Sequence, residues 1–177
     1  DRGLLTQYWD WLTGLFTGDF GTSLAQNVPV TELMGNALVN SLKLAAFAFA
    51  LVVPLAIFGG VVAALRRDRL TDRIITIGGL SLSVVPEFVS GIILILVFGL
   101  WLDLLPVSAR APAGASIPSQ LEYLLLPALT LVILLFGYIA RITRAGVVET
   151  LDADYTRTAY LKGLDHRTVV RRHVLRN

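Results

Sequence analysis

The sequence predicts an all-α membrane protein with three membrane-crossing helices. Hydrophobic residues make up 55% of the 177 residues and charged residues only 16%, whereas soluble domains carry roughly 25% charge. The charged residues also gather in a few clusters, which are separated by long apolar stretches. A soluble domain of this length would need more polar side chains to cover its surface, so we expect much of the chain to lie in lipid.

Three stretches have the length and apolar character of membrane-crossing helices. Residues 44–65 contain no charged side chain and, as a helix, would extend about 33 Å, enough to cross a hydrocarbon core. Residues 74–102 contain one charge, Glu87, and are too long for a straight crossing, so we expect a bend at Pro86. Residues 123–144 begin with an uncharged run and continue its helical pattern, which predicts the third span.

The distribution of cations predicts the orientation of these spans. The link at 66–73 holds four arginines and the tail at 145–177 is rich in Arg and Lys, so we expect both in the cytoplasm. Residues 1–43 and 103–122 hold few cations, so we expect both outside. Three crossings then place the start of the chain outside and its end inside.

The external segments have local patterns of their own. Apolar residues recur at helical spacing over residues 4–16, which predicts an amphipathic helix that ends near Gly18. A second helix is expected to run from residue 31 into the first span. The 103–122 link contains three prolines and Gly114, which predict an irregular loop.

Glycine pairs predict where the spans pack against each other. Residues 59–60 and 78–79 are both Gly-Gly, and glycine lets two helix backbones approach closely. We therefore expect helix contacts at both pairs.

The cytoplasmic tail is predicted to fold as two short helices. The first runs from Asp154 to Lys162 and ends at Gly163, because glycine readily adopts the positive φ that closes a helix. Asp165 is expected to cap the second helix, which runs to Arg176. One face of this second helix collects three valines and a histidine, namely Val169, Val170, His173 and Val174.

The role of this amphipathic helix is open at this point. A basic helix next to a membrane can bind anionic lipid, can cover the protein's own core, or can insert into a groove on another protein. Helical spacing does not distinguish these roles, because each of them needs one apolar face. General experience with such helices favours lipid binding or self-packing.

The tail resembles a segment of a known family. Residues 154–177 read D-Y-T-R-T-A-Y-L-K-G-L-D-H-R-T-V-V-R-R-H-V-L-R-N and resemble the cytoplasmic EAA loop of permease subunits in ABC importers, in particular the dipeptide, oligopeptide and nickel branch. Arg157 stands at the glutamate of the general EAA pattern, as this branch usually has it, whereas Ala159 and Gly163 remain. Four other segments are similar to the branch in the same order, namely residues 18–23, 85–88, 105–108 and 126–131.

The resemblance implies a fold and an extent. It implies the transmembrane domain of a type I ABC importer, with three transmembrane helices and a cytoplasmic coupling-helix (EAA) loop in this part of it. The family would have one span before residue 1 and two after residue 177, so we expect a fragment. The chain starts at Asp1 without a recognisable signal peptide, which agrees with that expectation.

The resemblance also implies a function. It implies a permease subunit that moves peptides, or a related small solute such as a nickel chelate, across the cytoplasmic membrane of a prokaryote. The partners implied are two ATPase subunits, a second homologous permease subunit, an external substrate-binding protein and the lipid bilayer. The chain has no G-x-x-x-x-G-K-[ST] motif, so ATP hydrolysis is expected on the separate subunits, and neither an enzyme activity nor a cofactor is expected here.

The resemblance assigns the ATPase contact to residues around Gly163. The helix that follows this glycine corresponds to the coupling helix, which sits in a groove of the ATPase and passes its movement to the spans. The residues assigned to the contact are Ala159, Gly163, Leu164, Val169, Val170, His173 and Val174. The three valines are expected to supply its buried apolar part, with arginines at the rim.

Glu87 is a candidate residue of the translocation pathway. An unpaired charge that faces lipid is unfavourable by at least about 2.5 kcal/mol, so we expect Glu87 to face protein, water or the pathway. It is either a pathway residue that meets the ammonium group of a substrate or a hydrogen-bonded carboxyl beside a disturbed helix. Ser83 and Ser90 flank it and serve either the same pathway or contacts between helices.

Two other classes of function remain open. An ATP-independent secondary transporter or channel subunit would have similar spans but no ATPase partner. An intramembrane enzyme would have to use Glu87, although no second carboxylate accompanies it within the spans. Metal and nucleic-acid binding are not expected, because His166 and His173 have no third ligand nearby and base-reading side chains are absent from the basic helix.

Overall fold

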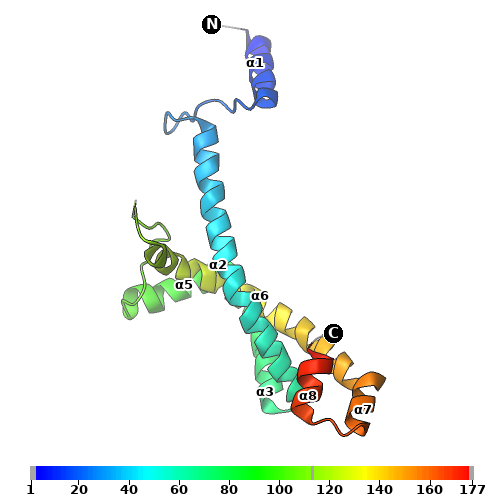
Figure 1. Cartoon of the computed structure of the whole chain (residues 1–177). Helices are drawn as coiled ribbons and strands as arrows, with labels where there is room; N and C mark the ends of the chain where they lie inside the picture. Colours follow the sequence, from blue (N-terminus) through cyan, green and yellow to red (C-terminus); the bar gives the residue numbers. More distant parts are fainter. Residues whose placement is uncertain (1–2, 113, 176–177) are drawn as a thin grey trace. The chain divides into compact units, whose positions relative to one another are not determined.

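The computed structural model describes residues 3–112 and 114–175, and within these ranges it consists of helices and their connections (Figure 1). Among the described residues no β-strand is formed, and a single isolated bridge joins Thr22 and Pro29. The predicted all-α class is confirmed. Contacts within the chain divide it into two units, residues 1–45 and 46–177.

The first unit contains helix α1 (Leu4–Thr17) and the beginning of α2 (Val30–Leu65). The φ of Gly18 is +85°, and this left-handed residue closes α1, as the pattern predicted. No side chain of α1 is buried by the described part of the chain, and most of its large apolar side chains are exposed. The apolar stripe of this helix is therefore available to lipid or to other protein.

Helices α2 and α6 (Ile117–Asp152) are both long and apolar enough to cross a membrane. Helix α2 includes the first predicted span and the helix predicted before it. Helix α6 includes the third predicted span but begins inside the link predicted over 103–122, so that prediction was wrong at its end. Pro118 lies in the first turn of α6, where proline is tolerated because its missing N–H would have no intrahelical partner.

The second predicted span is broken into two halves at residues 84–86. The halves are bent by 103° relative to each other, and together they give a third candidate crossing. The bend agrees with the prediction at Pro86, which has no N–H to continue the helix and which directly precedes the second half. The elements of the two halves are α3 (Leu70–Arg73), η1 (Ile74–Gly78), α4 (Gly79–Ser83), α5 (Glu87–Leu94) and η2 (Ile95–Trp101), where η denotes a π-helical segment.

Helix α6 is the element of the second unit on which η1, α4, α5, α7 and η3 pack. Helix α4 approaches it so closely that a Cβ on Gly137 would lie 2.3 Å from the backbone of Gly79. Helix α2 approaches it at Gly60, where a Cβ would lie 2.6 Å from the carbonyl oxygen of Ala140. The predicted packing at the two glycine pairs is confirmed except at Gly78, whose Cβ position faces open space. Small residues therefore set the spacing of these helices.

The C-terminal tail folds as the two predicted helices. Helix α7 (Asp154–Leu161) follows α6 after a bend at Ala153, which has an extended conformation. Helix α8 (His166–Val169) continues into the π-helical segment η3 (Val170–Val174) without interruption. The predicted end of this second helix at Arg176 lies outside the described residues.

Candidate functional site

The turn between α7 and α8 is closed by Gly163, whose φ is +81°. The N–H of Gly163 donates to the carbonyl of Tyr160 at 2.9 Å, and the N–H of Leu164 donates to the carbonyl of Ala159 at 3.3 Å. This pair of hydrogen bonds is the Schellman motif, which satisfies the last carbonyls of a helix. A residue with a Cβ would be strained at this φ, although the space around the Cβ position is open. The predicted role of Gly163 as the residue that ends α7 is confirmed.

Asp165 begins the second helix of the loop. Its carboxylate accepts a hydrogen bond from the backbone N–H of Thr168 at 3.2 Å, which is the N-cap that the pattern predicted. Hydrogen bonds from the hydroxyl and the N–H of Thr168 lower the pKa of Asp165. The folded loop therefore favours the charged form of this carboxyl, as expected at the positive end of a helix.

A small apolar core joins the loop to the ends of α2 and α6. Five buried residues form it, one each from α2, α6, α7, α8 and η3, namely Ala64, Val147, Ala159, Val169 and Val174. Thr156 of α7 is fully buried, and its hydroxyl donates to the carbonyl of Thr150 in the last turn of α6 at 2.7 Å. The same carbonyl accepts the N–H of Ala153 at 3.4 Å, so the bond from Thr156 gives it a second donor at the end of α6. The loop is thus a packed extension of the two long helices.

The three valines predicted to contact the ATPase are buried within this chain. Val169, Val170 and Val174 are 0%, 9% and 3% exposed, and the first and last belong to the core of this chain. Their contact with an ATPase subunit stays a prediction, and in this conformation the three side chains are buried within the chain itself. The resemblance assigned the apolar face of α8 to a partner, whereas its periodicity is the same whether the helix packs outward or inward.

The remaining residues assigned to the contact differ in exposure. Ala159 is buried, His173 is partly buried, and Gly163 and Leu164 are exposed. Leu161, which the sequence analysis did not single out, is 82% exposed at the end of α7. The available sequence signal was its helical position, because Leu161 falls on the opposite face of α7 from Thr156 and Ala159.

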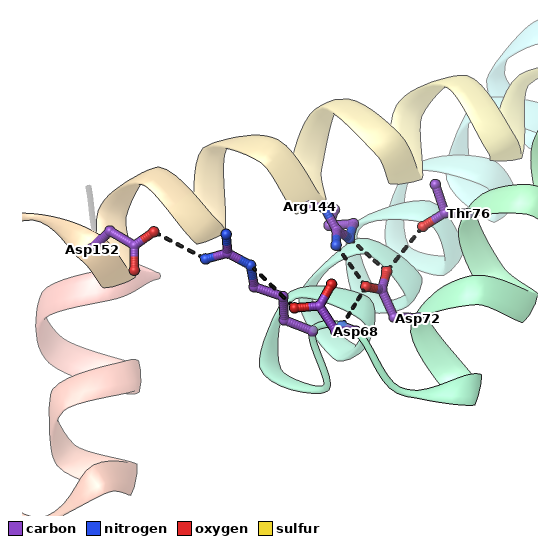
Figure 2. A network of polar contacts seen from close by, with 6 residues as sticks. Asp68, Asp72, Thr76, Arg144 and Asp152 are labelled. Atoms are coloured by element: carbon purple, nitrogen blue, oxygen red, sulfur yellow. Dashed lines mark hydrogen bonds and ion pairs between the residues drawn. The ribbon is translucent and has the colours of Figure 1, made fainter.

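The sequence analysis also missed a polar cluster beside the loop (Figure 2). Asp72 of α3 is only 4% exposed, and Arg144 of α6 binds both of its carboxylate oxygens through Nε and Nη2 at 2.5 and 2.6 Å. The Asp72 carboxylate also accepts the backbone N–H of Asp68 at 3.0 Å and the hydroxyl of Thr76 at 3.2 Å. A bidentate pair with further donors satisfies a carboxylate that is nearly out of reach of water.

A second ion pair links the same connection to the end of α6. Nη1 of Arg67 lies 3.1 Å from the carboxylate of Asp152, and both side chains are more than half exposed. Exposed pairs of this kind stabilise a fold by roughly 0–1 kcal/mol. The loss of stability when one partner of a buried pair is removed is larger, about 3–5 kcal/mol. The connection between α2 and α3 is therefore held mainly by Asp72 and Arg144.

The comparisons with known proteins agree with this arrangement. Residues 56–177, more than half of the chain, match the family described as the binding-protein-dependent transport system inner membrane component. The chain belongs to this family. Residues 66–175, which carry the polar cluster and the loop, lie entirely within the matched range.

Relatives of this inner membrane component extend the similarity to the whole chain. A Brucella abortus protein (strain 2308), provisionally named a peptide transport system permease protein, is 35% identical over 178 residues, which are 100% of this chain and 56% of the relative. The oligopeptide transport system permease protein OppB of Escherichia coli (strain K12) is 35% identical over 176 residues, or 98% and 55% of the two chains. The chain spans a little over half the length of these relatives.

The three pathway candidates of this inner membrane component, Ser83, Glu87 and Ser90, differ in their surroundings. The hydroxyl of Ser83 donates to the carbonyl of Gly79 at 3.0 Å and lies 3.5 Å from the carbonyl of Ile133 on α6. Ser90 is 8% exposed, on a helix that packs against α6. Both serines thus lie at helix contacts, which is one of the two uses considered for them. Glu87 is exposed in the first turn of α5, where a helix N-terminus favours negative charge.

Proposed function

We propose that this chain is part of the permease subunit of an ATP-driven importer that moves peptides, or a related small solute such as a nickel chelate, across the cytoplasmic membrane. One observation carries the proposal: the two-helix loop around Gly163 is packed onto the ends of α2 and α6 by a shared core. A loop with such a core moves together with these helices when another protein pushes on it. The names of the peptide and oligopeptide permease relatives support the choice of cargo.

The ATPase contact is proposed on the exposed side of this loop. We call the exposed residues Tyr160, Leu161, Gly163 and Leu164 the docking face. Leu161 would be the apolar anchor, because it has the largest free apolar surface in the loop. The exposed cations around it, Arg157, Lys162 and Arg167, would orient the partner and speed association.

The proposed assembly has the partners expected of such an importer. Two ATPase subunits would bind from the cytoplasm, a second homologous permease subunit would complete the pore, and an external binding protein would deliver the cargo. The family's dependence on a binding protein supports the last of these. The 66–73 link and the loop would face the cytoplasm, because their arginines favour that side.

Glu87 is proposed as the residue of the pathway that attracts the cargo. Its carboxylate is exposed beside the break at residues 84–86, in the middle of the bent candidate span. Because the described residues leave this carboxylate exposed in the middle of the candidate span, it must face water, lipid or another subunit. An aqueous pathway that admits the ammonium group of a peptide is the favoured environment among these.

Uptake by the complete importer tests the proposed function. The full-length permease is reconstituted in proteoliposomes with its partner permease, the two ATPases and the binding protein, and accumulation of a labelled oligopeptide is measured with and without ATP. Accumulation should require both ATP and the binding protein. Equal uptake without ATP would support the secondary-transporter alternative and overturn the proposal.

Cross-linking tests the docking face directly. The chain contains no cysteine, so Leu161→Cys introduces one reactive position in this segment, and a short bifunctional reagent should join it to an ATPase subunit. Leu104→Cys, which is also exposed but lies in the link predicted to be external, is the matched control and should not form this product. A Leu161→Cys variant that reacts only with lipid would contradict the assignment of the docking face.

A further inference from the structure

We propose that the Asp72–Arg144 ion pair is a positioning contact that makes α3 and α4 follow α6 when the ATPase moves the loop. This inference rests on the proposed function, because it concerns how movement received at the loop reaches the bent candidate span. It adds a role for two residues that neither the EAA resemblance nor the proposed docking face includes.

The geometry of the pair restricts both distance and orientation. Two nitrogens of Arg144 donate to the two carboxylate oxygens of Asp72, at 2.5 and 2.6 Å (Figure 2). The two hydrogen bonds fix the orientation of the guanidinium relative to the carboxylate as well as the distance between them. The hydroxyl of Thr76 and the N–H of Asp68 donate to the same carboxylate. These neighbours in the chain fix the carboxylate relative to α3. A single-point contact would allow α3 to pivot around α6, whereas this one does not.

A second contact lies farther along the same two helical segments. Gly79 follows Asp72 by seven residues, and Gly137 precedes Arg144 by the same number. The two glycines meet where a Cβ on Gly137 would lie 2.3 Å from the Gly79 backbone. The two contacts are thus about two helical turns, or roughly 10 Å, apart on antiparallel segments. Two contacts at this separation prevent α3–α4 from sliding or rotating on α6 independently.

Helix α6 continues without a break from this pair of contacts to the loop. It runs through Val147, a member of the core with Val169 and Val174, and through Thr150, whose carbonyl holds Thr156 of α7. Displacement of the loop therefore moves the end of α6. The ion pair then carries this movement to α3 and α4. These two helices belong to the first half of the bent candidate span, which directly follows the 66–73 link in the sequence.

The ion pair is the part of this path that a mutation can weaken without removing a charge. Arg144→Lys keeps the positive charge next to the buried Asp72 carboxylate but replaces the planar two-point contact by a single ammonium. Asp72→Ala would instead leave Arg144 without its partner and would threaten folding. Arg67→Lys is the matched control, because it makes the same change in the exposed ion pair with Asp152.

The experiment measures peptide uptake and ATP hydrolysis in the same proteoliposomes of the complete importer. Arg144→Lys should leave ATP hydrolysis in place but lower the number of peptides taken up per ATP by about tenfold, the factor that corresponds to one charge-assisted hydrogen bond. Arg67→Lys should leave this ratio at the wild-type value. Thr76→Val, which removes one donor to Asp72 and no charge, should lower the ratio by a smaller factor.

Two results would overturn the positioning role. The first is a wild-type ratio in Arg144→Lys, whether both rates are normal or uptake and hydrolysis fall in parallel, as a merely structural residue would cause. If Arg144→Lys does not assemble, an unchanged ratio in Thr76→Val decides against the role and a lowered ratio decides for it. A wild-type importer without ATP-dependent uptake would be a failure of the proposed function itself, and it is recognised before any variant is compared.

Discussion

The hydroxyl of Tyr160 lies 2.7 Å from Nδ1 of His166, and the two rings are stacked with an angle of 12° between their planes. Tyr160 belongs to α7 and His166 begins α8, so this contact spans the turn at Gly163. It supplements the Schellman motif, which stabilises only the end of α7, and the Asp165 cap, which stabilises only the start of α8. The angle between the two helices of the loop is therefore held by side chains as well as by backbone.

Replacement of Tyr160 tests this contact. Tyr160→Phe keeps the stacked ring but removes the hydroxyl, so the turn should open more often while the fold persists. Hydrogen exchange of the amides of residues 162–165 should speed up about fivefold, since an exposed hydrogen bond contributes about 1 kcal/mol. Amides in the middle of α6 are the internal control and should be unaffected. Equal exchange in the loop of the variant and the wild type would mean that the hydroxyl does not hold the turn.

The pH dependence of the loop should follow Asp165. Its pKa is lowered in the folded state, so its contribution to stability is present above the unfolded pKa and is lost as pH falls through the folded value. Hydrogen-exchange protection of the Thr168 amide, corrected for the intrinsic rate, should decline below about pH 4. Asp165→Asn retains a capping oxygen without a titrating group, so its protection should not depend on pH in this range. A wild-type profile as flat as that of the Asn variant would contradict the assignment.

Truncation of Val169 should destabilise the loop. This residue is fully buried in the core formed with Ala64 and Val147, so Val169→Ala leaves a cavity and should lower the stability of the loop by about 2 kcal/mol. Leu161→Ala removes a larger side chain, but one that is 82% exposed, and should change stability little. Limited proteolysis within residues 154–175 of the assembled permease compares the two. Faster cleavage of Leu161→Ala than of Val169→Ala would show that the valine is not the buried one.

The contact between α4 and α6 should not tolerate a methyl group at Gly137. Its Cβ would overlap the backbone of Gly79, which cannot move as a flexible side chain can. Gly137→Ala should therefore lower the thermal midpoint of the detergent-solubilised assembly by several degrees or prevent assembly. Gly146→Ala on the same helix is the control: nothing lies within 4 Å of its Cβ position, and alanine favours the helix by up to about 1 kcal/mol. Equal midpoints for the two variants would refute the close approach.

Several features of the fold were predictable because they depend on neighbouring residues alone. The end of α7 at Gly163 and the start of α8 at Asp165 follow from backbone conformation and capping, which are local properties. The bend before Glu87 follows from the missing N–H of Pro86. The early start of α6 was missed because a proline in a first helical turn looks the same, in sequence, as a proline in a loop.

The site was predictable only in part. Its location around Gly163 came from the resemblance, and the contact of Val169, Val170 and Val174 with an ATPase stays a prediction, whereas their burial within this chain is a result of packing. An arginine such as Arg144, at the end of the predicted third span, requires a partner, and this requirement was the available signal for the ion pair. The sequence does not say which of several acidic residues meets that need.

The amino-acid order by itself determined the helical class, the apolar spans, the capped turn and the family, because each depends on composition, periodicity or short motifs. Only the tertiary structure decided that the valines of α8 face the ends of α2 and α6, that Gly79 meets Gly137, and that Asp72 pairs with Arg144. These contacts join residues far apart in the chain. The physical reason is that an apolar face or a charge specifies that it must be covered, but the arrangement of the helices in space chooses what covers it.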